Sequence, residues 1–296
     1  MNAIHKAVIP AAGYGTRMLP ITKAVSKEML PIVDTPVIQF VVEELMEAGI
    51  DDIIIVTAPH KTDLQRYFEP TSEDLAVRLR PGSPADQSLR RIEAIQQAVR
   101  IRFIEQTGGL YGTGVPVLCA EPYLDGEPFI YTFADDFFVS QENSYRQLLA
   151  AYTRHQAPVV ACQRRTQDED YSRYAYMGGA ELAPGEVLIR SIIEKPGKAD
   201  APGDLASIGG FIVTPDMLSY LRRVQAVLPA GKELFFNSAF DPMLADGQCI
   251  IAKEIVGADY YDTGNNLEYV KTVIDIALRR PDMQAELREY LRKKLA

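Results

Sequence analysis

The N-terminal part of the sequence alternates between short apolar runs and one helical stretch, and this order constrains the fold more than any other feature. Lys6–Pro10 (KAVIP) and Ile53–Thr57 (IIIVT) are short apolar runs that predict buried strands. Between them, four apolar residues recur at the spacing of one helical face: Ile38, Val41, Val42 and Leu45. Gly49 is expected to end that helix. Strand, helix and strand in this order predict a βαβ unit, and therefore an α/β protein with a parallel sheet.

Further apolar runs extend the predicted sheet. Ile101–Glu105, Phe129–Ala134 and Val159–Ala161 are expected to be strands, and shorter β-like runs follow at Val187–Glu194 and Ile208–Thr214. The character of the chain changes at about residue 165, but no linker composition marks that point. Residues 1–296 are therefore expected to form one domain, with one half over about 1–165 and the other over about 166–296.

Charge and composition exclude several classes of protein. Apolar residues make up 47% of the 296 residues and the net charge is −9, which argues against nucleic acid or an anionic membrane as a partner. The N-terminus lacks the apolar stretch of a signal peptide, and no apolar run is long enough to span a membrane. The three cysteines are far apart and predict neither a disulfide framework nor a zinc site. These features predict a reduced, cytoplasmic enzyme.

A glycine-rich segment directly follows the first predicted strand. Gly13 and Gly15 lie in the sequence AAGYGTR, where glycines let the backbone approach an anion closely. Arg17 adds forked donors suited to phosphate, and Lys23 and Lys27 lie in the same extended segment. No Gly-Lys-Ser/Thr follows, and the third glycine of GxGxxG is absent, so neither a Walker loop nor a dinucleotide fingerprint is present. A plain tight turn is the alternative, but the clustered cations and glycines favour a polyphosphate site.

Aspartates stand at two places that suit a metal ion. Asp135 and Asp136 follow the predicted strand Phe129–Ala134, and Asp262 begins the sequence Asp-Thr-Gly. Ligands of open α/β sheets gather at the carboxyl ends of strands, and Mg²⁺ needs only one or two protein carboxylates besides phosphate oxygens. The alternatives are an Asx turn at the Asp135 pair and a helix N-cap at Asp262, and spacing alone leaves them open.

Glu194 and Lys195 lie at a predicted strand end. A glutamate can bind sugar hydroxyls and a lysine can pair with a sugar phosphate, although an exposed charged strand exit is the alternative. The histidines are scattered, and the sequence has no nucleophile elbow. Nucleotidyl transfer needs neither, because a sugar 1-phosphate is itself an anionic nucleophile near neutral pH. Positioning and electrostatic stabilisation are sufficient for that reaction.

These features together resemble the sugar-phosphate nucleotidyltransferase family. Its hallmark is the segment Ala11–Pro31 (AAGYGTRMLPITKAVSKEMLP), which with the following VDTPVIQFVVEE is similar in particular to the bacterial UTP–glucose-1-phosphate uridylyltransferase branch. The resemblance is dense in the N-terminal part and continues as islands, which are Asp135, Glu194-Lys195-Pro196, Gly209 and Asp262-Thr263-Gly264.

The resemblance implies a fold, a reaction and an assembly. The fold would be a Rossmann-like, mostly parallel mixed sheet flanked by helices, with a nucleotide-binding half over about 1–165. The half over about 166–296 would bind the sugar and supply the C-terminal helices. The reaction would be the Mg²⁺-dependent transfer of UMP from UTP to glucose 1-phosphate, giving UDP-glucose and pyrophosphate. The protein would be a homo-oligomer, either a dimer or a tetramer.

The resemblance also implies which residues bind the nucleotide. Five residues of the hallmark segment would contact it, namely Ala11, Ala12, Gly13, Gly15 and Thr16. The uracil would contact Gln106, or else the glycines Gly108 and Gly112. Arg17 and Lys27 would hold the triphosphate.

The same resemblance assigns the sugar phosphate and the metal ion. The sugar phosphate would contact Tyr174, Glu194, Lys195 and Gly209, with Glu194 on the glucose ring and Lys195 on the phosphate. Asp135 and Asp262 would bind Mg²⁺. The candidate catalytic residues are Arg17, Lys27, Asp135 and Lys195.

The chain departs from the pattern of the family at five positions, which are Tyr111, Val115, Ala175, Asp204 and Asn237. The triphosphate half keeps the pattern and the sugar half differs more, so the same chemistry with another nucleotide or sugar 1-phosphate is an alternative. A catalytically silent nucleotide-sugar-binding regulator is a second, although it would not need both metal carboxylates. An NAD-dependent oxidoreductase is a third alternative, but it would need a complete GxGxxG, which this sequence lacks.

Overall fold

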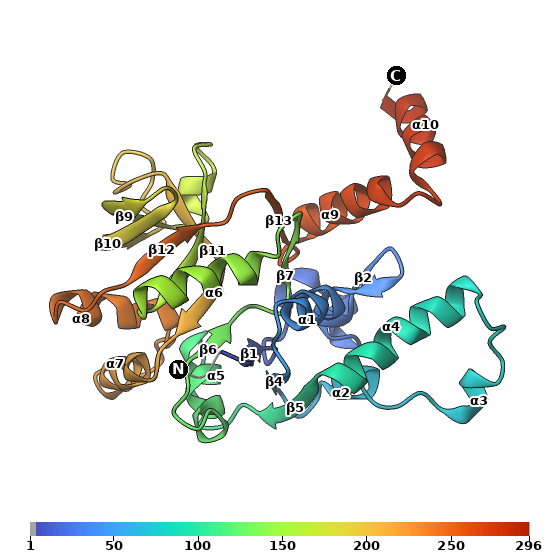
Figure 1. The fold of residues 1–296 in the computed structure, drawn as a ribbon, viewed down its shortest axis with the longest axis horizontal. Coiled ribbons are helices and arrows are strands. Elements are labelled where there is room, and N and C mark those ends of the chain that lie inside the picture. The colour runs from blue at the N-terminus through green and yellow to red at the C-terminus, as the bar shows by residue number, and fades with distance from the viewer. Residues whose placement is uncertain (1–3, 296) are drawn as a thin grey trace.

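The computed structural model describes residues 4–295, which contain a nine-stranded mixed sheet (Figure 1). Its strands lie in the order β5-β4-β1-β6-β11-β8-β12-β10-β9. They span Lys6–Pro10 (β1), Asp52–Thr57 (β4), Arg100–Glu105 (β5), Phe129–Tyr131 (β6), Val159–Arg164 (β8), Ala175–Ala183 (β9), Glu186–Glu194 (β10), Leu205–Val213 (β11) and Ile251–Glu254 (β12). Four further strands pair outside it: Pro31–Ile32 (β2) with Thr35–Pro36 (β3), and Asp136–Ser140 (β7) with Ala258–Asp262 (β13).

The sheet is parallel on one side and mainly antiparallel on the other. β1 pairs in parallel with β4 and β6, and β4 pairs in parallel with β5. β11 then runs antiparallel between β6 and β8, and β9 forms an antiparallel hairpin with β10. The predicted α/β fold with a mixed sheet is confirmed. The antiparallel part is larger than the sequence indicated because β9, which was not predicted, extends it.

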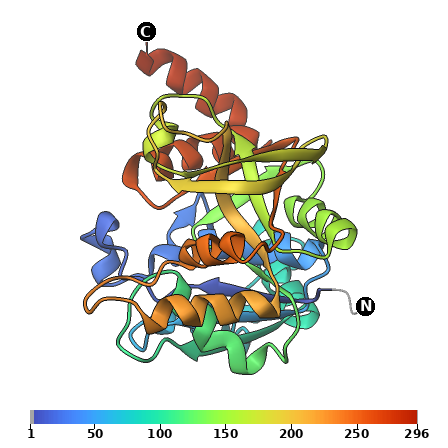
Figure 2. The same cartoon turned by 90° about the vertical axis from the view of Figure 1, so that its left-hand side faces the viewer.

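Helices cover both faces of the sheet (Figures 1 and 2). They span Val37–Glu47 (α1), Thr62–Tyr67 (α2), Glu73–Ala76 (α3), Pro84–Ala98 (α4), Gly114–Ala120 (α5), Ser144–His155 (α6), Pro215–Ala226 (α7), Phe240–Ala245 (α8), Asn266–Arg279 (α9) and Gln284–Leu295 (α10). The α3 and α4 segment extends outward from the parallel end of the sheet, and α10 extends away from the body at the C-terminal end (Figure 1).

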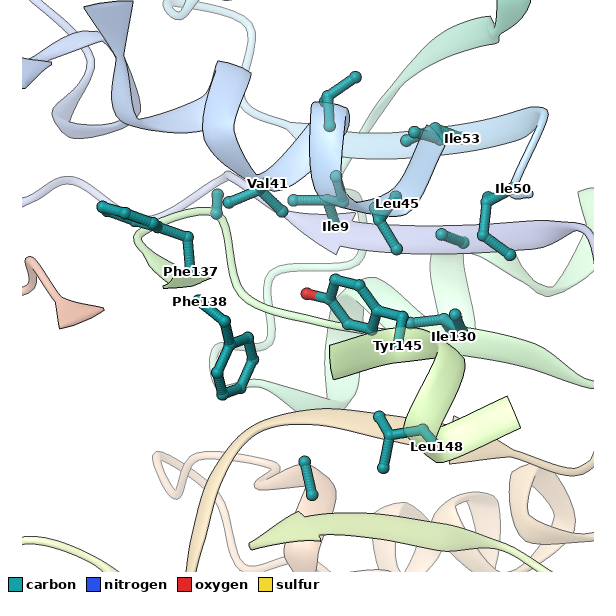
Figure 3. Packing of buried hydrophobic residues seen from close by; sticks show 14 of the residues in the cluster. Ile9, Val41, Leu45, Ile50, Ile53, Ile130, Phe137, Phe138, Tyr145 and Leu148 are labelled. Atoms are coloured by element: carbon teal, nitrogen blue, oxygen red, sulfur yellow. The ribbon is translucent and has the colours of Figure 1, made fainter. Parts of the chain in front are cut away.

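The core is divided into two layers by the alternation of side chains along the strands. Ile9 and Ile53 pack with α1 and α6 on one face, through residues such as Leu45 and Tyr145 (Figure 3). Val8 lies between Ala7 and Ile9 in β1, and its side chain points to the other face of the sheet, where it packs with α5, α7 and α8. Because successive side chains of a strand point to opposite faces, the continuous apolar runs of the sequence place apolar side chains on both faces of the sheet.

The predicted strand Phe129–Ala134 is shorter in the structure. β6 ends at Tyr131, and Asp136 begins β7, which leaves the sheet and pairs with β13. The Thr132 hydroxyl shares a hydrogen bond of 2.7 Å with the Tyr145 hydroxyl of α6, at the point where the chain turns away. Asp135 and Asp136 therefore do not end a strand of the sheet. Asp135 lies in the connection between β6 and β7.

Within residues 4–295, no helix combines the length and the apolar character needed to cross a bilayer. All three cysteines lie in this described part, and each is free.

Glu44 gives the stability of the fold a predicted pH dependence. Its side chain on α1 is buried, and its Oε2 accepts a hydrogen bond of 3.2 Å from the Phe138 amide of β7. Burial raises the pKa of Glu44 from 4.5 to about 8, although that hydrogen bond opposes the shift. The folded state therefore binds the proton more tightly than the unfolded state does, and Glu44 makes the free energy of unfolding fall as pH rises through this range.

We expect Glu44→Gln to remove that contribution. Urea denaturation at about pH 5 and about pH 8 should show a smaller loss of stability in the variant than in the wild-type protein. Glu73→Gln, at an exposed position of α3, is the control and should keep the wild-type dependence. Equal pH dependence in wild type and Glu44→Gln would contradict the prediction.

Candidate functional site

Two adjacent cavities open beyond the carboxyl ends of the parallel strands. The first has a volume of about 400 Å³ and the second of about 660 Å³. Thr113, Phe133 and Asp135 line both of them, so the cavities meet at Asp135. This is the edge of an open α/β sheet at which ligands bind.

Turns that follow β1, β4 and β5 form the walls of the first cavity. Ala12 and Gly13 come from the turn after β1, and Gln106 and Gly112 come from the loop after β5. The turn after β4 contributes His60, whose ring stacks on Tyr14 with centroids 5.2 Å apart and an angle of 10° between the planes. The cavity thus combines exposed backbone with a flat aromatic wall.

The glycine-rich loop after β5 is held by the chain that precedes α8. The Leu234 amide donates to the carbonyl oxygen of Tyr111, and the Gly114 amide donates to the carbonyl oxygen of Leu234, both at 2.8 Å. Gly112, between them, has a φ of 112°, and a Cβ there would lie 2.4 Å from the Leu234 oxygen. Only glycine suits this position, since both the backbone angle and the close approach exclude a side chain.

The same segment presents one side chain to each cavity. Leu234 is buried, whereas its exposed neighbours Glu233 and Phe235 line the first and the second cavity respectively. A single short stretch of chain therefore contributes to the walls on both sides of the junction.

Lys27 and Asp135 form the ion pair at this junction. The ammonium nitrogen of Lys27 lies 2.5 Å from Oδ2 of Asp135, and both side chains are largely buried. Burial alone would lower the pKa of Lys27, but the nearby charges of Asp135 and Glu28 outweigh it and raise that pKa. Lys27 is therefore a fixed cation at the meeting point of the two cavities.

Asp262 lies beside Asp135 because β13 pairs with β7. The backbone amide and the hydroxyl of Thr263 both donate to the carbonyl oxygen of Asp135, at 3.0 and 2.8 Å. A Cβ on Gly264 would lie 2.9 Å from Oδ1 of Asp262 and 3.1 Å from Oδ2 of Asp135. Two carboxylates thus face one small space that a side chain at residue 264 would fill.

This pair of carboxylates fits a Mg²⁺ ion. Magnesium prefers oxygen ligands and is commonly bound by one or two carboxylates together with substrate phosphates. Among residues 4–295, no group of three or more His, Cys, Asp or Glu side chains is arranged to hold a metal ion. A site for an ion that is completed by phosphate needs no larger group.

Asp136 is the third carboxylate of this region and points toward β11. The Tyr260 hydroxyl donates to its Oδ2 at 2.7 Å, and a Cβ on Gly209 would lie only 2.6 Å from the same oxygen. Burial raises the pKa of Asp136 well above its usual range, and the charges of Asp135 and Asp262 add to the shift. Gly209 is therefore needed for space beside this carboxyl group.

Charged residues at the outer end of β10 line the second cavity. Glu194 and Lys195 are exposed, with Nζ of Lys195 at 3.5 Å from Oε1 of Glu194. The Lys195 backbone has a φ of 47°, and its amide donates to the carbonyl oxygen of Tyr174. Arg173 lies over the Tyr174 ring at 5.3 Å and within 3.4 Å of Oδ2 of Asp262.

The structure brings most of the predicted site residues to these cavities. The first is lined by Ala12, Gly13, Lys27, Gln106, Gly112 and Asp135, and the second by Arg17, Asp135, Tyr174, Glu194, Lys195, Gly209 and Asp262. Five of the predicted residues line neither cavity in the described chain: Ala11, Gly15, Thr16, Lys23 and Gly108. The Ala11 amide donates to the Val56 oxygen at 2.7 Å, and Gly15, with a φ of 63°, packs against Lys27.

Sequence reasoning missed several residues of the walls, namely Tyr14, His60, Arg173, Glu233 and Phe235. His60 has no local signal in the sequence, because its stacking partner Tyr14 lies in another turn. Arg173 is adjacent to the predicted Tyr174, which was the only local signal available for it. The others have no spacing that could distinguish them from surface residues.

A family model described as nucleotidyl transferase matches residues 6–277. A UTP–glucose-1-phosphate uridylyltransferase of Streptococcus pneumoniae serotype 4 is 38% identical over 98% of this chain and 96% of its own length. The UTP–glucose-1-phosphate uridylyltransferase YngB of Bacillus subtilis is 35% identical over 97% of this chain and 94% of its own.

Solved structures agree with these sequence relatives. A UDP-glucose pyrophosphorylase complexed with UDP-glucose has a TM-score of 0.83 at 33% identity, covering 94% of this chain and 100% of that one. A UTP-bound UGPase from Acinetobacter baumannii has a TM-score of 0.84 at 27% identity, covering 97% of this chain and 98% of that one.

The close approach at Gly112 yields a test of the loop. We expect Gly112→Ala to lower the free energy of unfolding by about 1–3 kcal/mol, because the loop must separate from Leu234. Gly109→Ala is the matched control, since Gly109 also has a positive φ (69°) but no atom within 4 Å of its added Cβ. Denaturant unfolding measures both, and a Gly112→Ala variant no less stable than Gly109→Ala would contradict the interpretation.

Proposed function

The chain belongs to the nucleotidyl transferase family, and from this premise we propose that it is a UTP–glucose-1-phosphate uridylyltransferase. It transfers UMP from UTP to glucose 1-phosphate, forming UDP-glucose and pyrophosphate. The observation that carries the proposal is the pair of cavities that meet at Asp135, with Lys27 and Asp262 beside the junction. Such an arrangement lets two phosphate-bearing substrates meet at one charged centre.

The nucleotide occupies the first cavity in this proposal, within the half of the chain over about 1–165. Ala12 and Gly13 approach the uridine with their backbone, and Gln106 and Gly112 lie where the uracil would be contacted. The glycines support this assignment because backbone can reach a ligand closely where no side chain intervenes.

The sugar phosphate occupies the second cavity, formed mainly by residues over about 166–296. Glu194 accepts hydrogen bonds from hydroxyl groups of the glucose ring, and Lys195 pairs with the phosphate. Tyr174 and Gly209 complete this wall, and their positions in the same cavity support the assignment.

The reaction is a displacement at the α-phosphorus of UTP. A phosphate oxygen of glucose 1-phosphate forms the new P–O bond, and the bond to the leaving pyrophosphate breaks. The nucleophile is already an anion, so no general base is required. Lys27 and Arg17 stabilise the negative charge that grows on the phosphate oxygens, and the cavity walls align the two substrates.

Asp135 and Asp262 are the residues that would hold Mg²⁺. When bound, the ion would neutralise charge on the substrate phosphates. The support for this assignment is that both carboxylates face the space beside Gly264. Lys27 and Arg173, which contact these carboxylates, keep their side chains in place around the same space.

We also propose that the protein is a cytoplasmic homo-oligomer, either a dimer or a tetramer. The support for assembly is α10, which extends from the body and has no buried side chain among its described residues. Its exposed Tyr290 offers an apolar ring to a second copy of the chain.

Pyrophosphate release is the experiment that tests the proposed reaction. Each of UTP, dTTP, GTP, CTP and ATP is paired with glucose 1-phosphate in the presence of Mg²⁺, and the sugar is then varied. We expect release with UTP and glucose 1-phosphate, its loss on chelation with EDTA, and its recovery on addition of Mg²⁺.

Other outcomes of this experiment are equally informative. Ala175 and Asn237 line the second cavity and depart from the family pattern, so a preference for another sugar would locate the specificity there. No release with any pair would overturn the proposal and favour a silent nucleotide-sugar-binding regulator.

Lys195→Ala separates the two substrates. We expect the KM for glucose 1-phosphate to rise by about 10- to 100-fold, as for the loss of a charged hydrogen bond, and the KM for UTP to change by less than about 2-fold. Lys198→Ala is the matched control, because that lysine is exposed and pairs with Asp168 at 2.7 Å. Equal losses for both substrates would remove Lys195 from the sugar-phosphate role.

A further inference from the structure

We propose that Lys61 and Asp63 are positioning residues that place Lys27 against Asp135 by holding the residues on either side of it. Lys27 has Ser26 and Glu28 as its chain neighbours, and each is bound by a side chain of the short segment at the start of α2. This inference rests on the proposed function, since it deepens the role of Lys27 in that reaction.

Asp63 holds the residue before Lys27. Its Oδ2 accepts a hydrogen bond from the Ser26 amide at 2.7 Å, and its Oδ1 accepts one from the Ser26 hydroxyl at 2.6 Å. Ser26 precedes the tight turn Lys27–Met29 and makes no capping hydrogen bond to it; its hydroxyl donates to Asp63. Two hydrogen bonds to one carboxylate fix both the backbone and the side chain of Ser26.

Lys61 holds the residue after Lys27. Its ammonium nitrogen lies 2.9 and 2.8 Å from the two carboxylate oxygens of Glu28, and both side chains are buried. A buried ion pair adds little net stability compared with an apolar pair, but its geometry is specific, and losing one partner is costly. The pair therefore fixes the position of Glu28 rather than simply strengthening the fold.

The two contacts hold both chain neighbours of Lys27. With both neighbours held from the α2 side, the chain between them presents Lys27 to Asp135, 2.5 Å away. The segment that holds them is continuous with His60, which lines the first cavity. The wall of the nucleotide cavity and the position of its fixed cation are thus set by one piece of chain.

A double-mutant cycle distinguishes this positioning role from a general effect on folding. Asp63→Ala is expected to lower kcat/KM for UTP by about 10- to 100-fold, the size of effect that a small misplacement of a catalytic group produces. In a Lys27→Met background the same change should cost less than about 2-fold, because the group that it positions is already absent. Asp63→Asn keeps one acceptor and should recover part of the activity.

Two controls accompany the cycle. Asp74→Ala removes an exposed aspartate of α3 that pairs with Arg78, and it should leave kcat/KM within about 2-fold of wild type. The double variant Glu28→Gln with Lys61→Met replaces the buried pair without leaving an unpaired charge, so it should fold and still lose activity. Equal losses from Asp63→Ala with and without Lys27 would overturn the proposal.

Hydrogen exchange tests the same contacts without any turnover. In Asp63→Ala, peptides that cover residues 24–31 should exchange faster than in wild type, while peptides of β11 remain unchanged. A wild-type protein that released no pyrophosphate would defeat the proposed function alone, and exchange would then decide the positioning role. Unchanged exchange at residues 24–31 would overturn that role whatever the activity.

Discussion

The repulsion among three aspartates is the physical constraint on which the site depends. Asp135, Asp136 and Asp262 gather where β7 pairs with β13, and their charges repel one another at short range. The Asp136 carboxyl is also removed from water, which adds to the cost of its charge. Lys27, at 2.5 Å from Asp135, and Arg173, at 3.4 Å from Asp262, offset part of this repulsion. The ion pairs that these two cations form therefore help to hold the carboxylates together.

The architecture of the sheet brings these cations to the carboxylates. Lys27 comes from the segment between β1 and α1, whereas Arg173 comes from the chain just before β9, which pairs with β10 and β11. The connection from β6 to β7 places Asp135 between them, where the two cavities join. In the proposed reaction, one charged centre would serve both substrates. Residues from both halves of the chain line each cavity.

The departures from the family pattern lie around this centre and not in it. Tyr111 lines the first cavity and Ala175 and Asn237 line the second, while Val115 is buried in α5 and Asp204 pairs with Arg164 at 2.8 Å. Wall residues determine which base and sugar fit, since binding pockets discriminate through shape and hydrogen bonds. In the proposed reaction, the charged groups at the junction act on phosphates, which are common to every pair of substrates.

The sequence by itself determined the α/β class, the positions of β1, β4 and β5, and the family, because apolar periodicity and the segment after β1 are local features. It also singled out Lys27, Asp135 and Asp262, but it extended the strand of Asp135 too far and missed β9. Only the tertiary structure decided that Asp135 meets Asp262 and that Lys61 and Asp63 hold the neighbours of Lys27. These contacts join segments that are distant in the chain, and no local pattern of residues specifies which strands and turns will pair across that distance.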